Sequence, residues 1–497
     1  MKDQPDLRMH RWSDEEFQAM RREVLGTWPT GREVHLDEAV AYLRTLPPHQ
    51  NQAWVLKQAL TEGRTVMQPG SLSDLPRKQA ARAGIALIDE WIKVLLEVQN
   101  DGQADALPTN LDTHTRENNY QMAELGIEES RREGSNMING FPVANYGIQG
   151  CRRVREAVDR PLVVRSGAAD SRLVMEVAWA SGFSDVPCGG IIMPTSHHKN
   201  VALADSIRNW QYVARLGAWY TEHGWPINHE VYGGLSGTLI PPSICLSYII
   251  IDSLIQAAQG IKFVSPGYTA TGNLIQDVAG VRVLKRLAGE YMARFDFADV
   301  TVSTTFYQWT GAFPHDPARS YALICWNSMA AVLGGATQVI VKSVQEATGL
   351  PTAQANAQAL RATKAVITML CNQKFPDSPE LAEEMHYIEI ETRAIVNRVI
   401  ELGDGDVVVG AAKAFESGVL DCPFSCWLPI ANKVMPARDA KGAIRFLDHG
   451  NLPLPAEAVK FHQSQLEIRS RLSGKPLDFD LTQADVVAAS EGRLIGR

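Results

Sequence analysis

Three arginines stand where apolar runs typical of β-strands end or helical patterns begin. Arg165 ends the run 162–164, Arg116 follows the segment 107–112, and Arg82 precedes a helical pattern. The guanidinium group is planar and binds a carboxylate through two parallel hydrogen bonds. If these positions meet at one edge of a sheet, the arginines could hold one carboxylate of a small acid. Otherwise they are unrelated surface or ion-paired arginines, and spacing alone does not exclude that alternative.

A lysine and a glutamate follow another apolar run, 339–341. Lys342 ends this predicted strand, and Glu346 comes four residues later. At this spacing the two residues usually form a surface ion pair; at a sheet edge they could bind ribose or phosphate oxygens instead. Glycines cluster at other predicted strand ends, where they would let a flat ligand approach the backbone. These glycines are Gly189, Gly190, Gly233, Gly234, Gly237, Gly267 and Gly272.

The arginines and the lysine need a scaffold that brings distant strand ends together. Strand and helix patterns alternate over most of the chain, which predicts an α/β fold, and we favour a closed TIM-type β/α barrel over an open sheet. In such barrels the chemistry takes place at the carboxyl ends of the strands. No GxGxxG or GxxxxGK[ST] motif follows a predicted strand, which argues against dinucleotide-binding and P-loop folds. The predicted strands span residues 65–69, 104–107, 136–141, 161–165, 189–193, 227–232, 261–266, 300–306 and 338–342.

The pattern divides the chain into three expected parts. Amphipathic helical patterns predict an N-terminal helical arm over residues 1–60. The alternating strands and helices place the barrel at 61–350. Beyond that point long helical patterns replace the alternation, and we expect a C-terminal helical subdomain over 351–497.

Composition narrows the functional class. The chain has 497 residues, of which 45% are hydrophobic and 21% charged, with a net charge of −8, as is ordinary for a soluble enzyme. The mild acidity and the lack of a Lys/Arg run argue against nucleic-acid binding. The N-terminus lacks an apolar signal segment, and the apolar stretch 239–258 is interrupted by two prolines and Asp252, so we expect a cytoplasmic protein without a membrane span.

The cysteines and histidines do not predict a metal site. Seven cysteines at irregular spacing are typical of reduced thiols. Cys422 and Cys426 have no second pair or nearby histidine, and His197 and His198 lack a third ligand at a suitable spacing. We therefore expect no resident metal ion.

The sequence resembles the large catalytic subunit of glutamate mutase (methylaspartate mutase, epsilon chain). Matching segments extend from about Trp12 to Arg497 and include THTRENNY, RPLVVRSG, FYQWTGAFPHD and EGRLIGR. The resemblance implies a β/α barrel that binds adenosylcobalamin at its mouth and converts L-glutamate to 3-methylaspartate by a radical rearrangement. It also implies a separate small cobalamin-binding subunit, because the DxHxxG cobalamin motif is missing here, and a homodimer of this chain within a heterotetramer.

The same resemblance assigns residues to the two sides of the site. Arg82, Arg116 and Arg165 would form a clamp on the substrate carboxylate. The residues implied on the cofactor side are Gly84, Asn139, Ser196, Phe313, Lys342, Glu346 and Leu350.

Four positions depart from the family on the side of the substrate amine. The family has a glutamate at Pro187, tyrosines at Met193 and His197, and a histidine at Ser166. A buried ammonium ion without a carboxylate partner is costly. The sequence therefore predicts either compensation for these losses or a different acid substrate, without the free amine or carried on a partner. A non-catalytic cobalamin-binding paralogue that acts as a binding or regulatory partner is the alternative function, and a cofactor-free barrel lyase is a third.

Overall fold

Parallel strands form the centre of the computed structural model, which describes residues 7–72, 87–134, 137–234 and 239–496. The strands of the main sheet are β1 (Val66–Pro69), β2 (Leu107–Asn110), β3 (Leu162–Arg165), β4 (Asp185–Cys188), β5 (Asn228–Val231), β6 (Phe263–Thr269), β7 (Thr301–Val302), β8 (Thr305–Tyr307) and β9 (Gln338–Val341). They are arranged in chain order from β2 to β9, with the short β7 paired only to β6, and β1 pairs with β9.

The sheet curves into a nearly closed barrel. The N–H of Asp105, two residues before β2, donates to the carbonyl of Met67 in β1 at 2.9 Å, which brings the two edge strands together. The strands are short and buried on both faces, as in Leu162–Arg165, and parallel sheets covered on both sides are built from such residues. The predicted TIM-type β/α barrel is confirmed.

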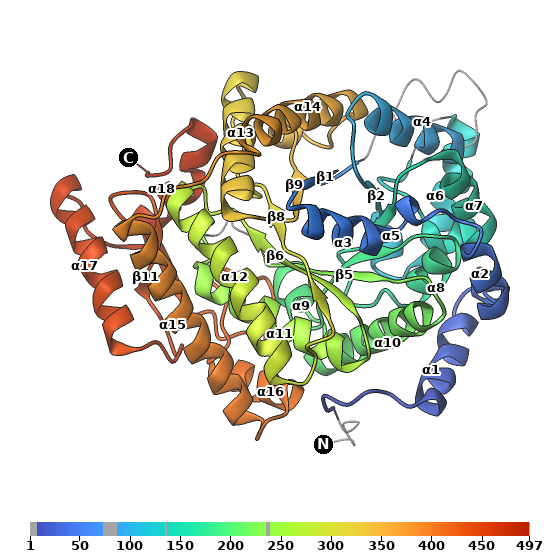
Figure 1. Ribbon diagram of the computed structural model, residues 1–497, viewed down its shortest axis with the longest axis horizontal. Coiled ribbons are helices and arrows are strands. Elements are labelled where there is room, and N and C mark those ends of the chain that lie inside the picture. The colour runs from blue at the N-terminus through green and yellow to red at the C-terminus, as the bar shows by residue number, and fades with distance from the viewer. Residues whose placement is uncertain (1–6, 73–86, 135–136, 235–238, 497) are drawn as a thin grey trace.

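Helices surround the strands (Figure 1). Between the strands lie α4 (Leu87–Asn100), α5 (Thr113–Arg116), α6 (Tyr120–Glu133), α7 (Val143–Ala157), α8 (Arg172–Ala180), α9 (Ile192–His197), α10 (Leu203–Glu222), α11 (Pro242–Ala258), α12 (Leu274–Arg294) and α13 (Pro317–Gly334). After β9 come η5 (Val344–Ala347) and α14 (Ala353–Leu370), and α14 packs against α13, α4 and β1. These contacts complete the ring of helices around the barrel.

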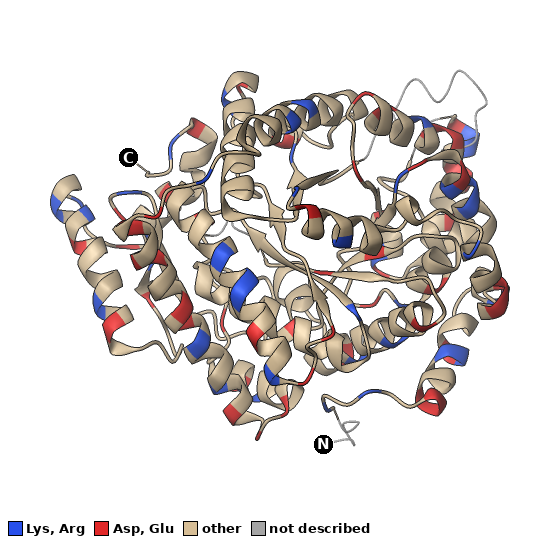
Figure 2. Ribbon diagram, viewed as in Figure 1, with Lys and Arg blue, Asp and Glu red and all other residues tan. Residues whose placement is uncertain are grey.

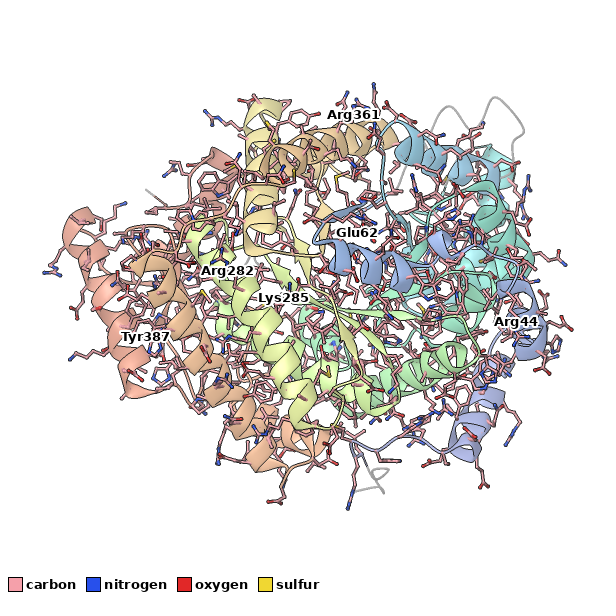
Figure 3. All side chains as sticks on the ribbon, in the orientation of Figure 1. Arg44, Glu62, Arg282, Lys285, Arg361 and Tyr387 are labelled. Carbon is pink, nitrogen blue, oxygen red and sulfur yellow. The ribbon has the colours of Figure 1, made fainter. Side chains whose placement is uncertain are left out.

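The N-terminal helices cover one side and one end of the barrel. They are α1 (Asp14–Gly26), α2 (Leu36–Leu43) and α3 (Gln52–Glu62). The side-chain amide of Asn51 donates to the Pro226 carbonyl at 2.9 Å, and the N–H of Gln52 donates to the Ser184 hydroxyl at 2.8 Å. Ser184 and Pro226 directly precede strands, so the start of α3 covers the amino-terminal end of the barrel; Glu62, labelled in Figure 3, marks the other end of this helix.

The C-terminal part packs on the outside of the barrel, against α11 and α12. It comprises α15 (Pro379–Leu402), α16 (Val407–Ser417), the antiparallel strands β10 (Met435–Arg438) and β11 (Ile444–Asp448), α17 (Ala456–Ser473) and α18 (Phe479–Ala488). Buried Arg445 forms ion pairs with Glu384 and Asp439 inside this part. In Figure 2 basic and acidic residues both occur along the outer helices.

Two predicted strands are wrong. Residues 137–141 form a loop, in which Gly140 packs so closely on the backbone of Asn110 and Leu111 that a side chain would not fit. The fourth strand is Asp185–Cys188, and Ile192 and Met193 begin α9 instead of forming a strand. In both cases a short apolar run was taken for a strand, and periodicity cannot distinguish a buried strand from a buried turn or helix of that length.

Among the described residues, no helix combines the length and apolar character that crossing a membrane requires.

Candidate active site

A cavity of about 170 Å³ opens at the carboxyl ends of the barrel strands. Its wall is made by Gly70, Arg116, Arg165, Gly167, Pro187, Met193, His197, Tyr232, Tyr307, Thr310, Ile340 and Lys342. A larger surface cavity of about 650 Å³ lies beside α1 and α10, away from the strand ends. We assign the candidate active site to the smaller cavity because barrel enzymes act at the carboxyl ends of their strands and because three cationic side chains meet there.

Arg116 lies at the end of the short helix α5. The carboxylate of Asp112 accepts hydrogen bonds from the N–H groups of His114 and Thr115 at 3.0 Å each and so begins this helix. The Arg116 Nε donates to the carbonyl of Leu111 at 3.0 Å. Partial burial lowers the pKa of Arg116, and Asp112 offsets only part of that effect. Its terminal nitrogens have no hydrogen-bond partner among the described residues, so they are available to an anion.

Arg165 is held much more firmly than Arg116. It donates through Nη1 to the carboxylate of the fully buried Glu230 and to the Tyr307 hydroxyl at 3.4 Å, and Tyr307 donates to the same carboxylate. With its carbonyl oxygen turned toward Arg165, the amide of Gln68 accepts from Nε at 3.1 Å and from Nη2 at 2.9 Å. Burial alone would lower the pKa of Arg165, but Glu230 and Tyr307 outweigh it and raise this pKa above its ordinary value. Most of the five N–H donors therefore already have protein partners.

A second buried carboxyl group lies near Glu230. Burial, and then the charge of Glu230, raise the pKa of Asp185 well above its ordinary value. Its side chain accepts from the Asn228 amide at 2.9 Å, and Asn228 in turn accepts from Ser265 at 2.9 Å. Burial and the charge of Glu230 therefore favour the protonated form of Asp185, and Glu230 is the carboxylate in direct contact with Arg165.

The helix α9 carries Met193 and His197 to the cavity. Its first turn is fixed by the buried carboxylate of Asp252, which accepts from the N–H groups of Ile191 and Ile192 at 3.1 Å. The ring of His197 packs against Tyr232 with 5.7 Å between ring centres. Asp252 thus positions one wall of the cavity from behind.

A sequence profile of the methylaspartate mutase E chain (MutE) family matches residues 46–497. Three proteins named glutamate mutase epsilon subunit are similar over nearly their whole length. Those from Treponema denticola and Desulfitobacterium hafniense are 44% and 43% identical over 492 residues, covering 98% and 99% of this chain and 99% of each relative. That from Haloarcula marismortui is 39% identical over 487 residues, covering 98% of this chain and 96% of the relative.

This chain belongs to the methylaspartate mutase E chain family. The resemblance predicted from the sequence is confirmed, and the chain is a glutamate mutase-like subunit and an isomerase of the intramolecular-transferase type. An epsilon subunit implies a partner subunit, and the family implies a cobalamin-dependent system.

The cavity of this family member gathers several of the residues predicted for the substrate side. Arg116, Arg165, Pro187, Met193 and His197 all line it. Ser166 does not: its hydroxyl is buried beside Arg165 and has no partner among the described residues. Arg82 lies outside the described residues, so the third clamp arginine stays a prediction.

Of the predicted cofactor-side residues, Lys342 is the one that lines the described cavity. Lys342 joins the cavity wall, and its Nζ pairs with the Glu346 carboxylate at 3.2 Å, both side chains being 19% exposed. The amide oxygen of Asn139 accepts from the N–H of Thr113 at 2.9 Å. Phe313 is buried and Leu350 is exposed. Ser196 bonds within α9, and Gly84 lies outside the described residues.

Most of the glycine cluster has a role other than the predicted approach of a flat ligand. A methyl group on Gly233 would lie 1.9 Å from the Gly267 carbonyl, and one on Gly267 would lie 2.6 Å from the Tyr307 ring. Gly189 similarly faces Ile192 and Asp252, and Gly190 faces Ile207. These glycines serve the close packing of neighbouring strands and helices, and Gly237 lies outside the described residues.

Glu230 and Tyr307 are the functional candidates that the sequence prediction missed. Glu230 was visible as a charged residue within the predicted strand 227–232, and Tyr307 directly follows the predicted strand 300–306. Tyr307 belongs to the matching segment FYQWTGAFPHD, but that segment does not reveal its partners, and only the barrel brings both residues to Arg165. The described residues contain no group of three or more His, Cys, Asp or Glu side chains that could hold a metal ion.

Proposed function

We propose that this chain is the catalytic subunit of an adenosylcobalamin-dependent carbon-skeleton mutase whose substrate is an acid without a free ammonium group. One observation carries the substrate proposal. The described wall of the cavity contains three cationic residues, Arg116, Arg165 and Lys342, and no carboxylate. Such a wall favours an anionic substrate and gives an ammonium group no counter-ion.

The nearest carboxylates do not correct this imbalance. Glu230 is fully buried behind Arg165, whose charge it already balances. Glu346 is paired with Lys342. A substrate ammonium in the cavity would therefore lose its hydration shell without gaining an anionic partner, which is strongly unfavourable. Pro187 and Met193, where the family has glutamate and tyrosine, supply only apolar surface on that side.

The mouth of the barrel has features that fit a large cofactor and a partner subunit. The exposed large apolar side chains include Met137 (50%), Leu350 (60%) and Leu428 (65%). Leu350 follows β9 and η5, and the N–H of Leu428 donates to the carbonyl of Lys199, which follows α9. We propose that adenosylcobalamin and the small cobalamin-binding subunit cover this face, in a heterotetramer built on a homodimer of this chain.

Each cavity residue has a distinct task in this proposal. Adenosylcobalamin, when bound, supplies the radical that starts the rearrangement. Arg116 binds and orients the substrate carboxylate through its available N–H donors, while Arg165 offers a rigid second cation. Pro187 and Met193 exclude water from the carbon skeleton. The Lys342–Glu346 pair would hold the ribose of the adenosyl group, since both its members can bond hydroxyl groups.

Electron paramagnetic resonance tests the proposal directly. The chain, its small subunit and adenosylcobalamin are mixed with L-glutamate or with dicarboxylic acids that carry hydrogen, hydroxyl or methyl in place of the amine. We expect a cob(II)alamin signal with one of the latter acids and none with glutamate. A strong signal with glutamate would refute the altered substrate and retain the mutase. Bound cobalamin without a signal from any acid would favour the non-catalytic paralogue or a substrate tethered to a carrier.

A further inference from the structure

His197 stands at the cavity mouth, and its neighbour Ser196 decides which ring nitrogen carries the proton. The Ser196 hydroxyl oxygen lies 2.6 Å from the Ile192 carbonyl oxygen and 2.6 Å from His197 Nδ1. A serine hydroxyl has one hydrogen, and a carbonyl oxygen has none to donate. The contact with Ile192 therefore uses the serine hydrogen, so Nδ1 must carry the hydrogen of the second bond. Nε2 is left with its lone pair.

The lone pair of Nε2 lies in the same corner of the cavity as a guanidinium donor. A methyl carbon added to Gly167 would lie 3.8 Å from Arg116 Nη1 and 4.0 Å from His197 Nε2. No described residue donates a hydrogen bond to this nitrogen. A small ligand group beside Gly167 therefore meets a cationic donor and a neutral acceptor at once.

The surroundings keep the ring neutral. Burial of the ring against the cavity wall, and then the charges of His198 and Arg116, lower the pKa of His197 below its ordinary value. His197 is exposed at the mouth, where solvent screens part of this effect. Because the shift is downward, the ring stays an acceptor at neutral pH.

We propose that His197 is a specificity-determining residue that accepts a hydrogen bond from a substrate hydroxyl, so that the substrate is a hydroxy acid. This inference rests on the proposed mutase function and specifies its substrate class. An uncharged donor fits because the corner already contains Arg116 and the described wall has no carboxylate for a second cation. A cavity of about 170 Å³ also leaves little room for a bulky N-acyl group in place of the hydroxyl.

Three acids with one carbon skeleton test the proposal: glutarate, 2-hydroxyglutarate and L-glutamate. Their affinities are measured by isothermal titration calorimetry on the complete complex of the chain, its small subunit and adenosylcobalamin. We expect 2-hydroxyglutarate to bind about 10-fold more tightly than glutarate, as one net hydrogen bond allows. We expect L-glutamate to bind more weakly than glutarate.

Variants identify His197 as the source of the preference. His197→Phe keeps a ring but removes the acceptor, so the ratio of 2-hydroxyglutarate affinity to glutarate affinity should fall from about 10 to about 1. Ser196→Ala removes the hydroxyl that keeps the proton on Nδ1 of His197. The preference for 2-hydroxyglutarate over glutarate should then fall to about threefold. His10→Phe, an exposed histidine on the N-terminal segment, is the matched control and should leave every affinity unchanged.

The outcomes separate this inference from the function on which it rests. A hydroxyl preference that survives in His197→Phe, a wild-type preference for L-glutamate, or no binding of any of the three acids would overturn the inference. A His197-dependent preference without a cob(II)alamin signal would support the hydroxy-acid site and refute the mutase. A cob(II)alamin signal with L-glutamate alone would do the opposite.

Discussion

Replacing Glu230 by glutamine tests the buried charge balance below the cavity. Glu230 is fully buried, the Arg165 side chain is 8% exposed, and the carboxylate bonds both Arg165 and Tyr307. Removing one member of a buried ion pair costs about 3–5 kcal/mol, because the other charge stays buried without a partner. Glutamine has the same shape as glutamate and keeps a hydrogen-bond acceptor for Arg165. We therefore expect the free energy of unfolding to fall by about 2–3 kcal/mol.

A double-mutant cycle isolates the charge term. The variants are Glu230→Gln, Arg165→Met and the combination of both, compared by denaturant unfolding with several probes, since a chain of this length need not unfold in one step. The double variant contains no buried charge at these positions. Its loss of unfolding free energy should therefore be smaller than the sum of the losses of the two single variants, by about 2 kcal/mol or more. The exposed pair Arg132–Glu129 serves as the matched control, and its variants should change stability by less than about 0.5 kcal/mol.

The charge balance between Glu230 and Arg165 would be refuted if the losses of unfolding free energy in the two single variants added up to the loss in the double variant. That result would mean that Glu230 contributes packing and hydrogen bonds, and that the charge of Arg165 is balanced elsewhere. Asp185 would then be the first candidate, in its ionised form, because the charge of Arg165 favours that form.

Three further perturbations test other parts of the site. Arg116→Met should weaken binding of the acid substrate about 30- to 100-fold in calorimetry, as expected for a lost charge-assisted contact; unchanged affinity would exclude Arg116 from the carboxylate site. Burial raises the pKa of Asp252 to about 7 despite its hydrogen bonds to backbone N–H groups. The protonated side chain therefore contributes its full stabilisation below about pH 4, and this contribution is lost as the pH rises through about 7. Asp252→Asn should accordingly narrow the difference in melting temperature between pH 5 and pH 8, and an unchanged difference would contradict the assignment. Gly233→Ala should prevent soluble expression, because its methyl group would lie 1.9 Å from the Gly267 carbonyl; Gly289→Ala in α12, with nothing within 4 Å, should fold normally and gain up to about 1 kcal/mol.

The sequence predicted the barrel because its evidence is local and repeated. The apolar runs 162–164 and 339–341 became β3 and β9, and the residues that follow these runs, Arg165 and Lys342, line the cavity. The errors fell on short apolar runs whose neighbours decide their conformation. The run 189–193 turns into α9 because Asp252, about sixty residues later, binds its backbone N–H groups.

By itself the sequence determined the fold class, the family and the cationic residues at the strand ends, since these follow from local pattern and from matches spread along the chain. Only the tertiary structure decided which groups share the cavity and in what state. Glu230, Tyr307 and Arg165 lie on three different strands, and the barrel places them within hydrogen-bonding distance. The same packing raises the pKa of Asp185 and leaves Nε2 of His197 as an acceptor. Charge state and tautomer depend on burial and on neighbours distant in sequence, and no local pattern encodes these.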